Sequence, residues 1–317
     1  MNIVILDGYT LNPGDLDWSP IETLGNTTFY ERSSPGEITE RAKDAEALLV
    51  NKVILNDAIL SHLPKLKYIG VCATGYNNID IASTNKHGIT VTNVKAYGPA
   101  SVAQHTFALL LALVNRIETH SQSVFNGEWS SSEDFAYWKT PLVELAGKTM
   151  GLIGLGDIGS QVAQIALAFG MKVIAYRKNP ENTNNPAIKM VSMDTLFKES
   201  DVISLHCPLT EETKNIIRKE NLLLMKTSAY LLNTGRGPLI NEEDLAEALE
   251  KKIIAGAGLD VLSSEPPELT NPLLSAPNCV ITPHIAWASF EARKRLLQMV
   301  ADNLKAFING EPKNIVR

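Results

Sequence analysis

The 317-residue sequence is poor in cysteine. Only Cys72, Cys207 and Cys279 occur, an odd number, far apart and without a C-x-x-C pair. This scarcity argues against a disulfide framework and against a zinc site. We therefore expect no bound metal and a reducing, cytoplasmic compartment.

An excess of basic charge and a long apolar run are also missing. The 29 Lys and Arg residues face 35 Asp and Glu residues, so the net charge is -6 and nucleic acid is not an expected partner. The longest apolar stretch, residues 107–114, is far shorter than the ~18 residues needed to cross a bilayer. The N-terminus shows neither a basic n-region nor a small-residue cleavage site. We expect no membrane partner and no targeting segment.

What is present is a regular alternation of short apolar or β-branched runs with helix-length segments. This pattern predicts an α/β fold with largely parallel sheets, in a chain long enough for two domains. Expected strands lie at residues 3–6, 47–50, 68–71 and 90–93 and, further along, at 150–153, 173–176, 202–205, 230–233, 255–259 and 279–282.

Two helical segments suggest how the domains are joined. Residues 100–116 are too continuously apolar for a surface helix and fit a buried, domain-bridging one. Residues 288–309 form an amphipathic pattern with no strand after it, so we expect this helix to return to the first domain. The prediction is a doubly wound parallel Rossmann domain that binds a dinucleotide, residues 100–288, inserted into a smaller flavodoxin-like α/β substrate domain, residues 1–99 plus 289–317.

A G-x-G-x-x-G motif directly follows one expected strand and opens an expected helix. In such a loop the first glycine permits the tight turn, the second admits a pyrophosphate and the third allows close helix–strand packing. The alternative is a glycine-rich turn with no ligand, which the flanking strand and helix disfavour. We predict a cofactor site that contains Gly154, Gly156, Asp157, Ile158 and Gly159.

The residue that would select the cofactor departs from the NAD pattern. An acidic residue about 20 positions on would hold the ribose hydroxyls of NAD, but Arg177 and Lys178 stand there. A guanidinium suits a 2'-phosphate, so the pair favours NADP or use of both cofactors. The alternative is two solvated basic residues at a strand end, and NAD therefore stays open.

Polar residues follow four further expected strands, where ligands of a doubly wound sheet bind. Among them, Arg236, Glu265 and His284 suit the reduction of a 2-keto acid. The guanidinium can hold the substrate carboxylate, the imidazole can deliver a proton, and the carboxylate can orient the imidazole and stabilise its charged form. Singly, each has a plainer interpretation as a loop salt bridge, an acidic turn residue or a partly buried histidine. For His105, on the bridging helix, a core or interface role is the default.

At these residues the whole chain resembles the D-isomer-specific 2-hydroxyacid dehydrogenases, and within them the glycerate dehydrogenase/hydroxypyruvate reductase branch. The motifs that carry the resemblance are A-T-G-Y-N-N-I-D from Ala73, S-V-A-Q-H-T from Ser101, the glycine loop, H-C-P-L-T from His206, N-T-G-R-G from Asn233, G-L-D-V from Gly258, E-P-P from Glu265 and T-P-H from Thr282.

The resemblance implies catalytic roles for Arg236, Glu265 and His284 and a substrate held by two segments of the first domain. The carboxylate would bind N–H groups near Thr74 and Gly75, with Asn51 bordering the substrate. It also implies that Asp260 lies near the nicotinamide carboxamide and that the cofactor is further lined by Thr106, His206, Cys207, Pro208, Thr234 and His284.

The segment around Trp138 is similar to an arm that this branch exchanges between two subunits. The resemblance thus implies a homodimer. Trp138 then either reaches the substrate in a partner's active site or is buried at the interface without touching it.

The expected reaction transfers hydride between NAD(P)H and a small 2-keto acid, giving a D-2-hydroxy acid. Hydroxypyruvate/D-glycerate and glyoxylate/glycolate are the leading substrate pairs. One rival is a dinucleotide-sensing, corepressor-like binding module with the same fold. Another is a Rossmann methyltransferase, which would not need the Arg, Glu and His set.

Overall fold

The computed structural model describes residues 1–178 and 185–316. The chain divides into two compact units, one formed by Met1–Gly98 together with Ala288–Arg317 and the other by Pro99–Trp287. It therefore passes from one unit to the other twice, at residues 98–99 and at 287–288.

The first unit is built on a parallel sheet with strand order β2-β1-β3-β4-β5, the flavodoxin order. β3 and β4 are buried at every position, as expected for parallel strands with both faces covered. The strands are β1 (Asn2–Ile5), β2 (Asn26–Phe29), β3 (Ala47–Val50), β4 (Tyr68–Val71) and β5 (Thr90–Thr92). The helices are α1 (Ser19–Glu22), α2 (Ile38–Ala42), α3 (Asp57–Leu60), α4 (Ile81–Lys86) and α11 (Phe290–Ile308).

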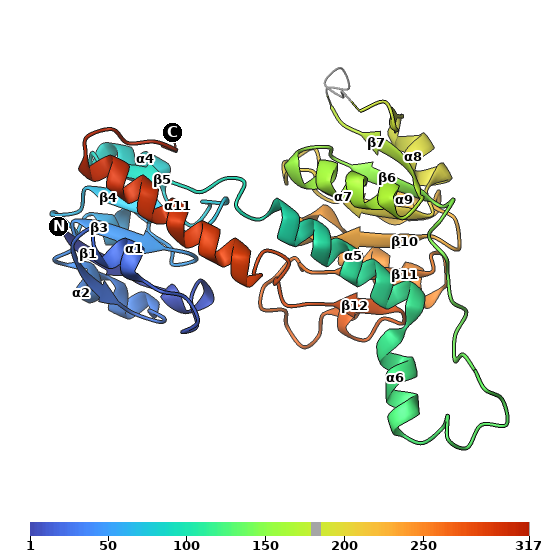
Figure 1. Ribbon diagram of the computed structural model, residues 1–317. Coiled ribbons are helices and arrows are strands. Elements are labelled where there is room, and N and C mark those ends of the chain that lie inside the picture. Colours follow the sequence, from blue (N-terminus) through green and yellow to red (C-terminus); the bar gives the residue numbers. More distant parts are fainter. Residues whose placement is uncertain (179–184, 317) are drawn as a thin grey trace. The chain divides into compact units, whose positions relative to one another are not determined.

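The long C-terminal helix α11 packs on the sheet of this first unit (Figure 1). The rings of Phe307 and Tyr68 lie 4.8 Å apart between their centroids, and Asn303 donates a hydrogen bond to the carbonyl of Asn93 at 3.0 Å. Val316 reaches the core of the unit. The amphipathic C-terminal segment thus completes the domain that the N-terminal segment begins.

The second unit contains a seven-stranded parallel sheet in the described part of the chain, with order β12-β11-β10-β9-β6-β7-β8. Its strands are β6 (Thr149–Ile153), β7 (Lys172–Tyr176), β8 (Ile188–Met190), β9 (Val202–Leu205), β10 (Tyr230–Asn233), β11 (Gly256–Leu259) and β12 (Cys279–Ile281). The chain leaves β6 toward β7 and then crosses back to β9, so the strand order reverses at β6. This is the doubly wound arrangement, and the predicted fold class is confirmed.

Helices cover both faces of this sheet (Figure 1). The first face packs on α5 (Pro99–Asn115) and α7 (Asp157–Ala168), with Phe107, Leu110 and Val162 in its core. The second packs on α8 (Met193–Glu199), α9 (Lys219–Leu222) and α10 (Glu242–Glu250), with Phe197 and Leu245 in its core. α6 (Ile117–Phe125) follows α5 after Arg116, whose φ of 48° breaks the helix.

The structure contains two strands, β2 and β8, that the sequence does not predict. β2 reads Asn-Thr-Thr-Phe and β8 spans only three residues. Both are edge strands, so neither needs the continuous apolar run that marks a strand buried on two faces.

Across residues 1–178 and 185–316, no single helix combines the length and apolar character that a bilayer crossing requires. α5 and α6 meet both criteria only when taken together across a bend of 56°.

Candidate active site

The predicted site residues of the second unit lie at one edge of its sheet. Because all neighbouring strands are parallel, their carboxyl ends meet at the same edge. The glycine loop follows β6, Arg177 follows β7, His206 follows β9, Arg236 follows β10, Asp260 and Glu265 follow β11, and His284 follows β12.

At two of the three loop glycines an added Cβ atom would clash with the protein, whereas at the third it would not. Gly154 has a φ of +98°, and a Cβ there would lie 2.6 Å from the carbonyl carbon of His206. A Cβ at Gly159 would lie 2.3 Å from the carbonyl oxygen of Gly154. Gly156, in contrast, has an ordinary φ of -88°, and a Cβ there would meet no protein atom within 4 Å. The space at Gly156 is therefore what a bound pyrophosphate would use.

The helix behind this loop offers hydrogen-bond donors to an anion. α7 begins at Asp157, and its N-cap, Gly156, supplies no capping side chain. The N–H groups of the first turn, which includes Ile158, lack intrahelical partners, and the helix dipole is positive at this end. The loop and the helix together fit the pyrophosphate of a dinucleotide.

At the end of β7, the two basic residues differ in their surroundings. Lys178 is exposed and donates to both carboxylate oxygens of Glu212, at 2.9 and 2.7 Å. This hydrogen bond raises the pKa of the Lys178 ammonium. Arg177 is half-buried beside it. A 2'-phosphate held by Arg177 and Lys178 stays a prediction, in which Lys178 would have to leave Glu212 or share its charge with it.

The segment after β9 closes against the glycine loop. His206 bonds through Nε2 to Ser204 Oγ at 2.8 Å, and burial of the ring lowers its pKa to about 4, so it is neutral near pH 7. Burial also raises the pKa of the Cys207 thiol to about 11, which keeps it protonated and a poor nucleophile. Pro208 is exposed.

Thr106 and Thr234, both expected along the cofactor, are buried and bonded to each other, with 3.1 Å between their hydroxyl oxygens. Thr106 also donates to the carbonyl of Val102 within α5. This contact ties α5 to the end of β10.

His284 and Glu265 form a direct pair. His284 Nδ1 lies 2.6 Å from Glu265 Oε2, and Glu265 Oε1 accepts the N–H of Leu262 at 3.1 Å. Because an ionised carboxylate only accepts hydrogen bonds, Nδ1 carries the hydrogen. The second nitrogen, Nε2, is left as the position from which a proton can be given or taken.

Arg236 lies on the loop that neighbours the one carrying Glu265. Its side chain is exposed and donates to the carbonyl of Gly235 at 2.8 Å. At the next residue, a Cβ on Gly237 would lie 1.9 Å from the carbonyl carbon of Leu262, so the two loops are in contact. The structure thus brings the loops of all three predicted catalytic residues to one edge of the sheet.

Asp260 is 1% exposed, and both of its carboxylate oxygens are used inside the protein. Oδ1 accepts from the Thr282 hydroxyl at 2.6 Å and from the N–H of Ile285 at 2.9 Å, and Oδ2 accepts from the N–H of Ala286 at 2.8 Å. A place for Asp260 beside the carboxamide stays a prediction. Sequence reasoning missed the contact of His105 with this cluster, which no motif signals: His105 Nε2 lies 2.9 Å from Thr282 Oγ1.

The predicted substrate residues of the first unit follow β3 and β4. Asn51 is buried, its N–H donates to Asp7 Oδ1 at 2.8 Å, and its Nδ2 donates to Thr10 Oγ1 at 2.7 Å. Thr74 is exposed and its hydroxyl donates to the carbonyl of Val94 at 2.8 Å, while Gly75 is half-buried. These contacts fix both loops at the carboxyl edge of their sheet.

Trp138 is 70% exposed in the segment between α6 and β6, and Phe135 beside it is 93% exposed. The segment is attached to α6 through a 2.6 Å hydrogen bond between Tyr137 and Ser123.

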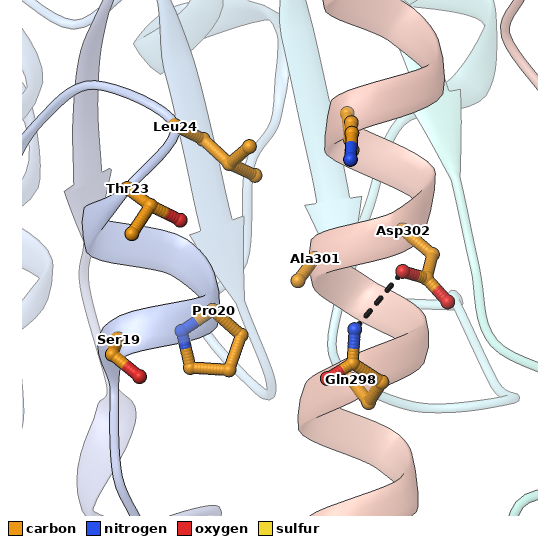
Figure 2. Close-up of a pocket in the computed structure, with 8 residues that line it drawn as sticks. Ser19, Pro20, Thr23, Leu24, Gln298, Ala301 and Asp302 are labelled. Atoms are coloured by element: carbon orange, nitrogen blue, oxygen red, sulfur yellow. Dashed lines mark hydrogen bonds between the residues drawn. The ribbon is translucent and has the colours of Figure 1, made fainter.

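The described residues also form a groove away from the predicted site, and they hold no metal-ligand set. A groove in the first unit runs between α1 and α11 and includes Ser19, Thr23 and Asp302 (Figure 2), but none of the predicted site residues lines it. Within residues 1–178 and 185–316, no three His, Cys, Asp or Glu side chains gather as a metal-ligand set.

Both the sequence and the fold of the chain match those of known proteins. Residues 107–286 match the family model described as D-isomer specific 2-hydroxyacid dehydrogenase, NAD binding domain. A hydroxypyruvate reductase of Blautia hydrogenotrophica is 47% identical, with 100% of this chain and 99% of that protein covered. The chain belongs to the D-isomer specific 2-hydroxyacid dehydrogenase family.

Two further comparisons agree with this membership. A glycerate dehydrogenase of Methylorubrum extorquens is 43% identical, with 90% of each chain covered. The structure of an acyclic imino acid reductase in complex with NADPH and D-Arg superposes with a TM-score of 0.85 at 33% identity, covering 100% of both chains. As a family member the protein is an oxidoreductase that uses NAD or NADP, and the corepressor-like alternative is not favoured.

We expect Gly156→Ala to weaken cofactor binding while leaving the fold intact. The added methyl group meets no protein atom but occupies the space at the helix N-terminus. Overpacking of this kind raises the Kd for NADPH and NADH by about 10- to 100-fold. Tryptophan fluorescence titration measures the Kd, and urea unfolding checks the fold. Gly36→Ala, also in open space, is the matched control. A Kd in Gly156→Ala equal to that of Gly36→Ala would contradict the assignment.

We expect His206 to make folding stability depend on pH. Burial lowers the pKa of His206 in the folded protein to about 4, below the ordinary histidine value of 6.5, so between these values the unfolded chain binds a proton that the folded protein excludes. The free energy of unfolding should be unaffected by this group above pH 6.5. It should fall by up to about 1.4 kcal/mol per pH unit as the pH drops toward 4. Urea unfolding from pH 7.5 to 4.5 tests this, with His206→Gln flattening the dependence and the exposed His62→Gln leaving it unchanged.

Proposed function

We propose that the protein reduces a small 2-keto acid to a D-2-hydroxy acid with NAD(P)H. The observation that carries this proposal is the 2.6 Å pair of His284 and Glu265 at the same sheet edge as the glycine loop. A proton donor, a residue that holds it and a dinucleotide loop at one edge are what carbonyl reduction requires.

The reaction divides among three side chains of the second unit. The Arg236 guanidinium binds the substrate carboxylate by paired hydrogen bonds and polarises the neighbouring carbonyl. Bound NAD(P)H supplies the hydride that adds to C2. His284 gives the Nε2 proton to the carbonyl oxygen, which becomes the hydroxyl of the product. Glu265 keeps Nδ1 protonated and stabilises the charged imidazole before the transfer.

Hydroxypyruvate is the substrate that we propose first, with glyoxylate second. The names of the two relatives at 47% and 43% identity support a three-carbon hydroxy acid. In this proposal the first unit is the substrate domain, with Asn51 beside the substrate and the N–H groups near Thr74 and Gly75 on its carboxylate. The second unit is the dinucleotide domain.

Of the two cofactors, we propose that NADPH is bound at least as well as NADH. Support comes from Arg177 at the end of β7, where a guanidinium suits a 2'-phosphate and an acid is absent. The proposed cofactor contacts include Thr106, Thr234, Cys207 and Pro208.

We also propose a cytoplasmic homodimer. The three free cysteines fit a reducing compartment. For the dimer, an apolar groove between α5 and α7, lined by Phe107, Ala108, Leu111 and Ile165 among others, is the face on which we place the exposed aromatic segment of a second copy. Trp138 belongs to that segment, which either reaches the substrate of the partner or is only buried.

The experiment that tests the function is a cofactor-oxidation assay with NADH and NADPH against hydroxypyruvate, glyoxylate and pyruvate. We expect turnover with hydroxypyruvate, and we expect Arg236→Lys to lower kcat/KM by about 100-fold, since a lysine cannot form the paired hydrogen bonds to the carboxylate. Arg218→Lys, at an exposed arginine paired with Glu220, is the control and should keep wild-type kinetics. The role of Arg236 is wrong if Arg236→Lys matches this control.

We expect the protein in solution to have twice the 34.6 kDa mass of one chain, as measured by light scattering after size exclusion. Ala108→Glu places a charge in the apolar groove and should shift the protein toward monomer, because Ala108 is exposed in one chain but buried in the proposed dimer. Ala82→Glu, on the exposed side of α4, should stay dimeric. A dimeric Ala108→Glu variant would place the interface elsewhere.

A further inference from the structure

The loop that carries His284 is wrapped around a buried carboxylate. Asp260 accepts the N–H of Ile285 at 2.9 Å and that of Ala286 at 2.8 Å, and its main-chain oxygen accepts the N–H of His284 at 2.8 Å. Consecutive N–H groups directed at one anion form a concave backbone site. At His284 the φ is +55°, a left-handed conformation that few residues with a side chain adopt. The carboxylate thus maintains the backbone geometry that holds the imidazole in place.

His105, from the middle of α5, contacts this arrangement from the side. Its Nε2 lies 2.9 Å from Thr282 Oγ1 and 3.4 Å from Asp260 Oδ1. The Thr282 hydroxyl has one hydrogen, which it donates to Asp260 Oδ1 at 2.6 Å. Thr282 can therefore only accept from His105, so His105 Nε2 carries a hydrogen. A directed chain of donors runs from His105 through Thr282 to Asp260.

This chain matters because the carboxylate at its end has no exposed surface. The side chain of Asp260 is 0% exposed and that of His105 is 19% exposed. Burial opposes ionisation of Asp260, but the nearby His105 ring, the Thr282 hydroxyl and the two N–H groups outweigh it and hold the pKa of the carboxyl below its ordinary value. A buried charge of this kind persists only when its hydrogen bonds are complete.

A second contact joins the same helix to the same loop. Ser101, one turn before His105 on α5, donates its hydroxyl to the carbonyl of Ala286 at 2.7 Å. Thus α5 holds the His284 loop at both ends, at Thr282 before the histidine and at Ala286 after it.

We propose that His105 is a positioning residue for His284, acting through Thr282 and Asp260 rather than by touching substrate or cofactor. The inference rests on the proposed role of His284 as the proton donor. His105 holds the Thr282 hydroxyl on Asp260, Asp260 holds the N–H groups of the loop, and the loop holds the imidazole toward Glu265.

The test compares three variants of the full chain. His105→Leu removes the donor, whereas His105→Gln keeps an N–H at a similar distance from the backbone. Thr282→Val removes the hydroxyl between His105 and Asp260 without changing the size of the side chain. We expect His105→Leu and Thr282→Val each to lower kcat by about 10- to 100-fold, the scale of effect of a misplaced catalytic group. Cofactor KM should change less than about threefold, because the glycine loop is not involved, and His105→Gln should recover most of kcat.

The double variant separates a chain of contacts from two independent ones. If both residues act in one chain, His105→Leu combined with Thr282→Val should be no slower than the slower single variant. The exposed His62→Leu serves as control and should keep the wild-type kcat. Equal kcat in His105→Leu and wild type, or an additive loss in the double variant, would overturn the proposal.

A readout that does not depend on activity separates this inference from the proposed reaction. The Nδ1 proton of His284, shared with Glu265 at 2.6 Å, should give a downfield proton NMR signal in the wild type. We expect the signal to broaden or vanish in His105→Leu and to return in His105→Gln. Persistence of the signal in His105→Leu counts against the positioning role. If the wild type reduces no keto acid, the proposed function is contradicted. The positioning role of His105 is then still tested by this NMR signal.

Discussion

The parallel direction of the strands is the constraint on which the site depends. In a sheet whose strands all run the same way, every loop that follows a carboxyl end starts from the same edge. The glycine loop, Arg236, Glu265 and His284 are up to 130 residues apart in sequence, from Gly154 to His284, yet each follows such an end. The direction of the strands alone therefore places these loops along one edge of the sheet.

Local interactions then fix what the sheet has gathered. Gly237 packs against Leu262 with no room for a Cβ, and this contact brings the loop of Arg236 against the loop of Glu265. Glu265 in turn accepts the N–H of Leu262 with one oxygen and His284 Nδ1 with the other. A single carboxylate therefore links His284 to the loop that packs against Gly237, the residue after Arg236. Few side chains are needed to fix the arrangement of these two loops, because backbone contacts at Gly237 and Leu262 provide much of it.

The sequence allowed prediction of those features that depend on local chemistry repeated along the chain. Buried parallel strands have continuous apolar runs, so the central strands of both sheets could be predicted. The spacing of the glycines indicates a tight turn followed by a helix start, so the loop between β6 and α7 could be predicted too. β2 and β8 could not, since edge strands lack that run. Nor could the hydrogen bond between His105 and Thr282, two residues that lie 177 positions apart. Nothing in either local sequence encodes their meeting; the packing of α5 on the sheet creates it.

This dependence on packing explains why the sequence does not predict the hydrogen bonds of Asp260. In the sequence it is one polar residue after a strand, equivalent to Arg236 or His284, and ligand binding is the natural expectation. In the structure its oxygens accept hydrogen bonds from Thr282, Ile285 and Ala286. Asp260 is buried and accepts N–H groups of the His284 loop, whereas Glu265 is more exposed and bonds to Nδ1 of the imidazole itself. Two acidic residues after the same strand thus act on His284 in different ways. Asp260 positions the backbone of the His284 loop, and Glu265 determines which imidazole nitrogen carries the hydrogen.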